Sequence, residues 1–217
     1  MTRQSVVLLH GIWMPGAEML LLRRRLEKSG EFNCHVYSYP SVKATLQENA
    51  DLLYEFVREL RLPDLHLVGH SLGGVVALRM LATQLDVPPG RVVCLGSPLC
   101  GSQAAAVLVN TSWGKAITGN TLDAGVVREP ASEWAGNVTA TRDVGVIAGT
   151  KAFGMGRIVT KFDGDNDGTV AVAETRLPAA RDHICIDVNH TALVTSRVVA
   201  EQTATFLRRG NFSPAIR

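Results

Sequence analysis

Short apolar runs alternate along the chain with longer segments whose apolar residues recur every three or four positions. The short runs have the length and composition of strands buried on both faces, and they lie at residues 5–9, 34–39, 65–68, 92–95, 144–148 and 184–188. The periodic segments predict amphipathic helices, at residues 18–29, 41–60, 72–85 and 191–208. Ser41 is the expected N-cap of the second helix. Strands that alternate with helices predict an α/β fold, with a mostly parallel sheet covered by helices on both faces.

One segment, residues 101–137, does not fit this alternation. It is rich in Ala, Gly, Ser, Thr and Asn and only weakly periodic, and we expect it to form a small cap or lid-like insertion. The sequence has neither an internal repeat nor a composition typical of a linker. We therefore predict a single domain over residues 1–217.

Composition excludes several classes of protein. The chain has 217 residues, 46% of them hydrophobic and 19% charged, which suits one globular domain with its own core. A net charge of +2 and 6% aromatic residues favour no nucleic-acid partner. No apolar run reaches the roughly 18 residues of a membrane span. The apolar run at residues 6–9 is too short for a signal peptide, so we expect a cytoplasmic protein.

The cysteines suggest no metal or redox chemistry. Cys34, Cys94, Cys100 and Cys185 form no C-x-x-C pair, and we expect neither a metal nor another cofactor. Cys34, Cys94 and Cys185 lie in the strand-like runs, where a free cysteine usually packs as a small buried hydrophobe.

A glycine-flanked serine follows the third predicted strand and opens the third helix. Gly69-His70-Ser71-Leu72-Gly73 fits G-x-S-x-G, the turn that presents a nucleophilic serine at the carboxyl end of a strand. Glycine on either side removes the Cβ atoms that so tight a turn would bring into collision. The new helix directs its first N–H groups to the same point, where they can stabilise an oxyanion. Ser71 is therefore the predicted nucleophile.

A serine nucleophile needs a base, and His190 is the best placed of the six histidines. It comes just after the last predicted strand, at the strand end where catalytic groups of open parallel sheets collect. His183 begins that strand, and His35 and His66 lie in or beside other strands, where structural roles are expected. His70 lies inside the turn and should point away from the substrate.

The acid that orients the base should lie between the serine and the histidine in the chain. The loop Asp163-Gly164-Asp165-Asn166-Asp167-Gly168 offers three aspartates, and residue pattern alone leaves the choice among them open.

Together these motifs resemble those of the α/β-hydrolase superfamily, in particular its small bacterial lipases and esterases. Leu8-Leu9-His10-Gly11-Ile12-Trp13 resembles the family's oxyanion motif, and residues 69–74 resemble its G-H-S-x-G-G turn. Asn166-Asp167-Gly168-Thr169-Val170 is similar to its N-D-G-x-V acid loop, and Asn189-His190-Thr191 to its histidine step. The matching motifs extend over most of the chain.

The resemblance implies a role for each matching residue. Ser71, Asp167 and His190 would be nucleophile, acid and base, and the backbone N–H groups of Ile12 and Leu72 would form the oxyanion hole. Trp13 is an alternative to Ile12. Larger members have additional strands before the oxyanion strand, which here begins at residue 5, so we expect a compact fold of about six strands.

The acidic loop also satisfies another motif. Asp163, Asp165, Asp167, Gly168 and Glu174 fit the calcium-loop pattern D-x-[DN]-x-[DN]-G-x5-E. An EF-hand needs a helix on each side of this loop, and neither flank is helical in pattern. Calcium held in another geometry remains a second interpretation, with Asp163 and Asp165 as ligands.

The expected reaction is hydrolysis of a carboxylic ester, of acyl or lipid type, through an acyl-enzyme. An apolar acyl pocket could be lined by Trp13, Met14, Leu99, Val107, Leu108 and Trp113. The expected partner is thus a small ester or lipid. A thioesterase uses the same residues and is the nearest alternative, transacylation to an alcohol is another, and a non-enzymatic calcium-binding module is the alternative from a different class.

Overall fold

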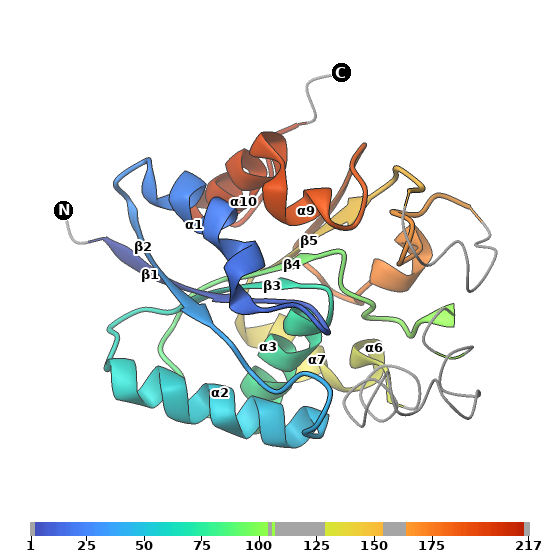
Figure 1. Cartoon of the computed structure of the whole chain (residues 1–217). Helices are drawn as coiled ribbons and strands as arrows, with labels where there is room; N and C mark the ends of the chain where they lie inside the picture. Colours follow the sequence, from blue (N-terminus) through green and yellow to red (C-terminus); the bar gives the residue numbers. More distant parts are fainter. Residues whose placement is uncertain (1–2, 104–105, 107–128, 154–163, 215–217) are drawn as a thin grey trace.

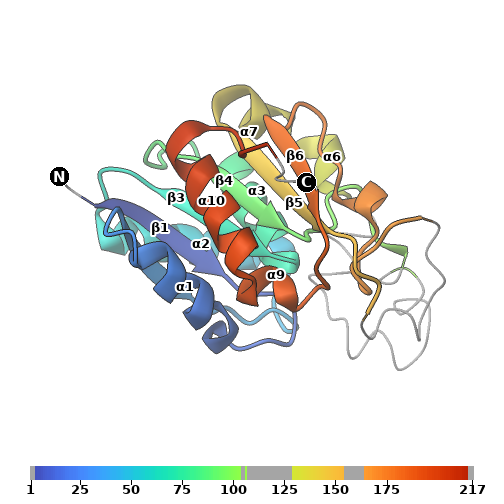
Figure 2. The same ribbon diagram turned by 90° about the horizontal axis from the view of Figure 1, so that it is seen from above.

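A parallel sheet of six strands runs through the molecule in the order β2-β1-β3-β4-β5-β6 (Figures 1 and 2). The computed structural model describes residues 3–103, 106, 129–153 and 164–214. The strands are β1 (Gln4–Leu9), β2 (Phe32–Tyr37), β3 (His66–His70), β4 (Val92–Leu95), β5 (Val144–Gly149) and β6 (Asp182–Ile186). All five neighbouring pairs are parallel. The predicted sheet is thereby confirmed.

Helices cover both faces of this sheet, as predicted (Figure 1). One layer contains α1 (Leu20–Glu27), α9 (Ala192–Thr195) and α10 (Arg197–Arg209). The other contains α2 (Leu46–Leu60), α3 (Leu72–Thr83), α6 (Ala131–Trp134) and α7 (Gly136–Thr141). The 3-10 turn η1 (Gly16–Met19) follows β1, and the 3-10 turn η3 (Val172–Thr175) precedes β6.

Alternation along the strands divides the interior into two cores. Val7 and Leu9 of β1 pack towards α2 and α3, whereas Val6 and Leu8 pack towards α1 and α10. All four side chains are fully buried. Strands that are apolar on both faces can only be central strands, which accounts for the continuous apolar runs in the sequence.

The second helix begins later than its periodicity predicted. Ser41 is not the N-cap, because α2 starts at Leu46 with Thr45 as its cap. Thr45 and Glu48 form a capping box, in which each side chain accepts the backbone N–H of the other. Ser41 instead accepts the N–H of Trp13 at 3.3 Å.

The last predicted helix is divided into two. Helix α9 ends at Thr195, and Ser196 adopts an extended conformation and caps α10 through its side chain.

The burial of Cys185 also differs from the prediction. Cys34 and Cys94 are buried as expected, but Cys185 is exposed because β6 is the edge strand.

Most of the expected cap at residues 101–137 falls outside the described residues. The described part consists of residues 101–103, 106 and 129–137, which include α6. Among the residues that the structure describes, no helix combines the length and apolar character needed to cross a bilayer.

We predict that F206A lowers the free energy of unfolding by about 3–5 kcal/mol, because a cavity replaces a fully buried ring. Phe206 lies 4.7 Å from Phe212, centroid to centroid. Chemical denaturation measures the change. V198A is the control on the same helix, since Val198 is 51% exposed, and it should alter stability by less than about 0.5 kcal/mol.

Candidate active site

Ser71 occupies a strained turn between β3 and α3. Its φ of 52° and ψ of −122° lie outside the regions favoured by residues with a side chain. The turn is held in place because the Ser71 N–H donates to the carbonyl of Leu95, at the end of β4 (2.8 Å). Ser71 directly follows β3, which places it at the carboxyl edge of the sheet, and it is only partly buried.

Two glycines allow this turn to pack tightly. A Cβ at Gly69 would overlap the backbone of Gly73 and Gly74 across the turn. A Cβ at Gly73 would lie 2.7 Å from the carbonyl oxygens of Leu9 and His10, at the end of β1. The glycines are therefore required by the close approach of helix α3 to the sheet.

His190 and Asp167 form a hydrogen-bonded pair. The distance from Nδ1 of His190 to Oδ2 of Asp167 is 2.6 Å. The Asp167 side chain is 1% exposed and that of His190 is 13% exposed. The N–H of His190 also donates to the backbone carbonyl of Asp167 (2.9 Å), so main chain and side chain are held together.

The remaining carboxylate oxygen of Asp167 orders its own loop. Oδ1 accepts the N–H groups of Thr169 (2.9 Å) and Val170 (2.7 Å). Both oxygens of this buried acid are thus used, one by His190 and one by the backbone. Of the acidic-loop aspartates that the structure describes, Asp165 and Asp167, it is Asp167 that pairs with His190.

Ser71 and the histidine pair lie at the carboxyl ends of the adjacent strands β3 and β4. A Cβ at Gly96, directly after β4, would lie 3.0 Å from Oδ2 of Asp167 and 3.2 Å from Nδ1 of His190. In the described residues Ser71 Oγ makes no hydrogen bond to His190. Such contacts often tighten only when a substrate is bound.

The backbone N–H groups expected to form an oxyanion hole differ in whether they have an acceptor. Gly11 donates its N–H to Glu18 (2.9 Å), and Trp13 donates its N–H to Ser41 (3.3 Å). Within the described residues, the N–H groups of Ile12 and Leu72 have no protein acceptor. Of the two alternatives for the first donor, Ile12 is therefore the one left available.

Sequence reasoning missed one buried residue, Glu18. Its carboxylate accepts the N–H of Gly11 and lies 3.3 Å from Nδ1 of His70. Burial on its own would raise the pKa of Glu18, but the contact with His70 and the N–H of Gly11 hold that pKa below its usual value. The signal available in the sequence was a charged residue in an otherwise apolar stretch, close to the oxyanion motif.

The other histidines have structural contacts. His10 stacks on Tyr39, and its Nε2 accepts the N–H of Tyr39 (3.2 Å). His66 Nδ1 accepts the N–H of Arg91 (2.9 Å), and burial lowers the pKa of His66 to about 4. His183 contacts the hydroxyl of Thr175 at 2.9 Å.

The calcium interpretation of the acidic loop gains no support. Both oxygens of Glu174 accept backbone N–H groups, those of Gln103 and Ala171. Asp163 lies outside the described residues, and those described include no group of three side chains suited to a metal ion. Of the residues in the calcium pattern, Asp167 is engaged with His190 and the backbone, and Glu174 with the backbone.

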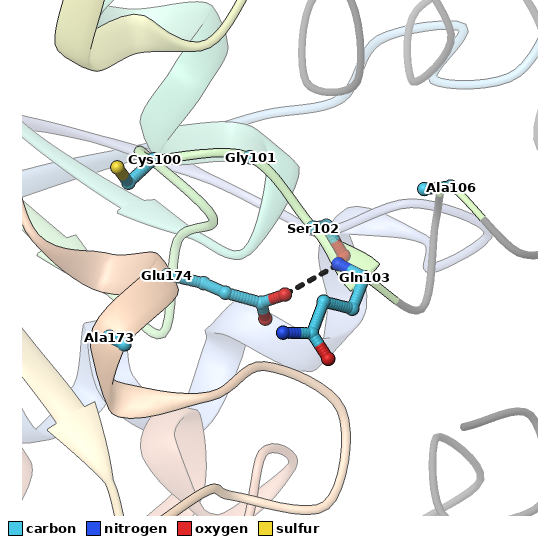
Figure 3. A pocket seen from close by; sticks show the side chains of 7 residues that line it. All are labelled: Cys100, Gly101, Ser102, Gln103, Ala106, Ala173 and Glu174. Carbon is cyan, nitrogen blue, oxygen red and sulfur yellow. Dashed lines mark hydrogen bonds between the residues drawn. The ribbon is translucent and has the colours of Figure 1, made fainter. Parts of the chain in front are cut away.

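A cavity of about 400 Å³ lies beside the acidic loop. Figure 3 shows the side chain of Glu174 extending towards the backbone of Gln103, and Cys100, Gly101 and Ala173 also line the cavity. Burial raises the pKa of Glu174, and the nearby charge of Asp167 adds to this effect. Asp167 and Glu174 accept the N–H groups of the adjacent residues Val170 and Ala171, so one wall of the cavity is continuous with the acidic loop.

The side chains expected to line an acyl pocket have different positions. Trp13 is 45% exposed and Met14 39% exposed, directly after Ile12. Leu99 is buried within the core and lines no open surface. Val107, Leu108 and Trp113 lie outside the described residues.

Comparisons with known proteins agree with this architecture. A family model described as "Alpha/beta hydrolase family" matches residues 6–206. The mature form of the Bacillus licheniformis lipase BlEst2 superposes with a TM-score of 0.71 at 18% identity, covering 96% of this chain and 92% of that one. The Bacillus subtilis carboxylesterase CesB gives 0.61 at 14% identity, covering 96% and 84%. No curated protein matches by sequence.

We predict that G69A destabilises the protein by about 3 kcal/mol, because the new methyl group collides with backbone atoms that cannot rotate away. Thermal or chemical unfolding measures the loss. G136A is the matched control, since nothing lies within 4 Å of a Cβ at that position. Equal stability of the two variants would contradict the account of the turn.

Proposed function

Because the chain belongs to the alpha/beta hydrolase family, we propose that it is a serine hydrolase that cleaves carboxylic esters through Ser71, His190 and Asp167. The observation that carries the proposal is the 2.6 Å contact between His190 and Asp167, beside a serine held at a φ of 52°. In this arrangement Asp167 fixes the tautomer of the base, His190, and the turn presents Ser71 as the nucleophile.

In the first half of the reaction, Ser71 attacks the ester carbonyl. His190 Nε2 takes the proton from Ser71 Oγ while the bond from Oγ to the carbonyl carbon forms. Asp167 keeps the second ring proton on Nδ1 and stabilises the imidazolium. The N–H groups of Ile12 and Leu72, which have no other acceptor among the described residues, stabilise the oxyanion.

The tetrahedral intermediate then loses its alcohol. The bond from carbon to the alcohol oxygen breaks, and His190 donates its proton to that oxygen. Water repeats the sequence on the acyl-enzyme, which releases the acid and restores the Ser71 hydroxyl.

The surroundings of the site favour an uncharged, apolar acyl group. Trp13 and Met14 present apolar surface beside the Ile12 N–H. The three buried carboxylates nearby, Glu18, Asp167 and Glu174, are committed to His70 and Gly11, to His190, and to backbone N–H groups respectively. None is left to recognise a cationic substrate. An ester or lipid fits better than an ionic compound.

We expect S71A to lower the turnover of a p-nitrophenyl ester by about 10⁶-fold, because the group that forms the acyl-enzyme is removed. A fluorophosphonate probe should label the wild-type protein and not S71A. Circular dichroism checks that S71A is folded. Turnover at the wild-type rate by folded S71A would contradict the proposal, and faster turnover of acyl-CoA than of esters would point to a thioesterase.

D167N should lower kcat by about 10⁴-fold, because an amide no longer fixes the tautomer of His190. D165N is the matched control two residues earlier. Because Asp165 is exposed, we expect D165N to keep the wild-type activity. Steady-state kinetics of the two variants measures the difference. If D165N were the more damaging change, the acid would be assigned to the wrong aspartate.

A further inference from the structure

A buried carboxylate–histidine pair lies directly behind the site, and the proposed chemistry does not use it. Oε1 of Glu18 is 3.3 Å from Nδ1 of His70, and the two side chains are 6% and 4% exposed. Glu18 lies in η1, just after the loop that carries Ile12, and His70 immediately precedes Ser71. Polar groups buried this far from water require partners to offset their desolvation.

The partners belong to two separate loops of the site. Oε1 of Glu18 also accepts the N–H of Gly11 (2.9 Å), the residue before Ile12. On its other side, His70 Nε2 lies 3.1 Å from the main-chain carbonyl of His190. The rings of His70 and His190 are 4.7 Å apart, centroid to centroid. One pair of side chains therefore connects the oxyanion loop with the loop that carries His190.

We propose that Glu18 and His70 are positioning residues, which hold the Ile12 N–H and the His190 ring in their working arrangement about Ser71. This inference rests on the proposed function, because it assumes that Ile12 and His190 act there. Neither residue touches the substrate. Small displacements of such groups are costly, since a shift of about 1 Å can reduce a rate by about 100-fold.

Counting protons shows why both members are needed. A neutral imidazole has a single N–H, yet His70 faces an acceptor at each nitrogen, Glu18 at one and the His190 carbonyl at the other. Both contacts form together only when the ring holds two protons or shares one with Glu18. Burial lowers the pKa of His70 and the neighbouring His190 ring adds to this, while Glu18 and the His190 carbonyl oppose both. Without Glu18, His70 would retain one contact at most.

His66 provides a comparison within the same strand. It is 2% exposed and, like His70, receives a backbone contact from another loop, in its case the N–H of Arg91. It stands at the opposite end of β3 from Ser71. If His70 contributed only to stability, replacing it would affect kcat no more than replacing His66.

The test compares H70F with H66F in the full-length protein. H70F keeps a flat ring beside His190 and removes both nitrogen contacts. We expect its kcat for a short p-nitrophenyl ester to fall by about 100-fold, with KM unchanged, because positioning acts on the transition state. H66F should be less stable than wild type but should keep the wild-type kcat.

Variants at position 18 keep the proposal testable if H70F fails to fold. In E18Q an amide oxygen can still accept the Gly11 N–H, so its kcat should lie between those of wild type and E18A. A graded order of wild type, E18Q and E18A at constant KM supports the proposal. Thermal unfolding identifies variants whose loss reflects unfolding alone.

Three outcomes would overturn the proposal: wild-type kcat in folded H70F and E18A, a change in KM in place of kcat, or an equal loss of kcat in H66F. The proposed function fails independently, through an active S71A variant. Activity lost in S71A but retained in H70F would leave the hydrolase assignment intact and reject the role of Glu18 and His70.

Discussion

The turn at Ser71 holds a residue with a side chain at a positive φ, and much of the surrounding structure serves to stabilise it. Strain of this kind costs about 1–3 kcal/mol and persists only where neighbouring contacts over-determine the backbone. Three contacts hold the turn. The N–H of Ser71 donates to the carbonyl of Leu95, Gly73 of α3 packs against the backbone at the end of β1, and Gly69 packs against the backbone of the first turn of α3. The turn therefore depends on the central strands being parallel, adjacent and in register.

A parallel sheet also explains why residues from distant parts of the chain meet there. Every strand ends at the same edge, so the loops after β1, β3, β5 and β6 deliver Ile12, Ser71, Asp167 and His190 to one place. Asp167 reaches it by a long connection after β5 and is then held by the turn it forms with Thr169 and Val170. The sheet provides the approximate position of each group, and hydrogen bonds within the loops refine it.

Buried carboxylates have a common function in these loops. Irregular backbone at the edge of a core has N–H groups that the sheet cannot satisfy, and each unpaired one would be costly. Glu18 accepts the N–H of Gly11, Asp167 those of Thr169 and Val170, and Glu174 those of Gln103 and Ala171. Two of these acids additionally contact a histidine, His70 or His190. The same carboxylates thus order the loops and set the charge around the site.

The sequence by itself determined the alternating strands and helices and the tight turn at Ser71, because periodicity and glycine spacing are local properties. It also indicated His190 as the candidate base and left three aspartates as candidate acids. It misplaced the start of α2, where Thr45 rather than Ser41 finds its capping partner in Glu48, and the burial of Cys185, which depends on β6 being an edge strand. Only the tertiary structure paired Asp167 with His190, left Ile12 rather than Trp13 with a free N–H among the described residues, and brought Glu18 to His70. Those outcomes depend on hydrogen bonds between residues up to 52 positions apart in the chain, which local patterns do not encode.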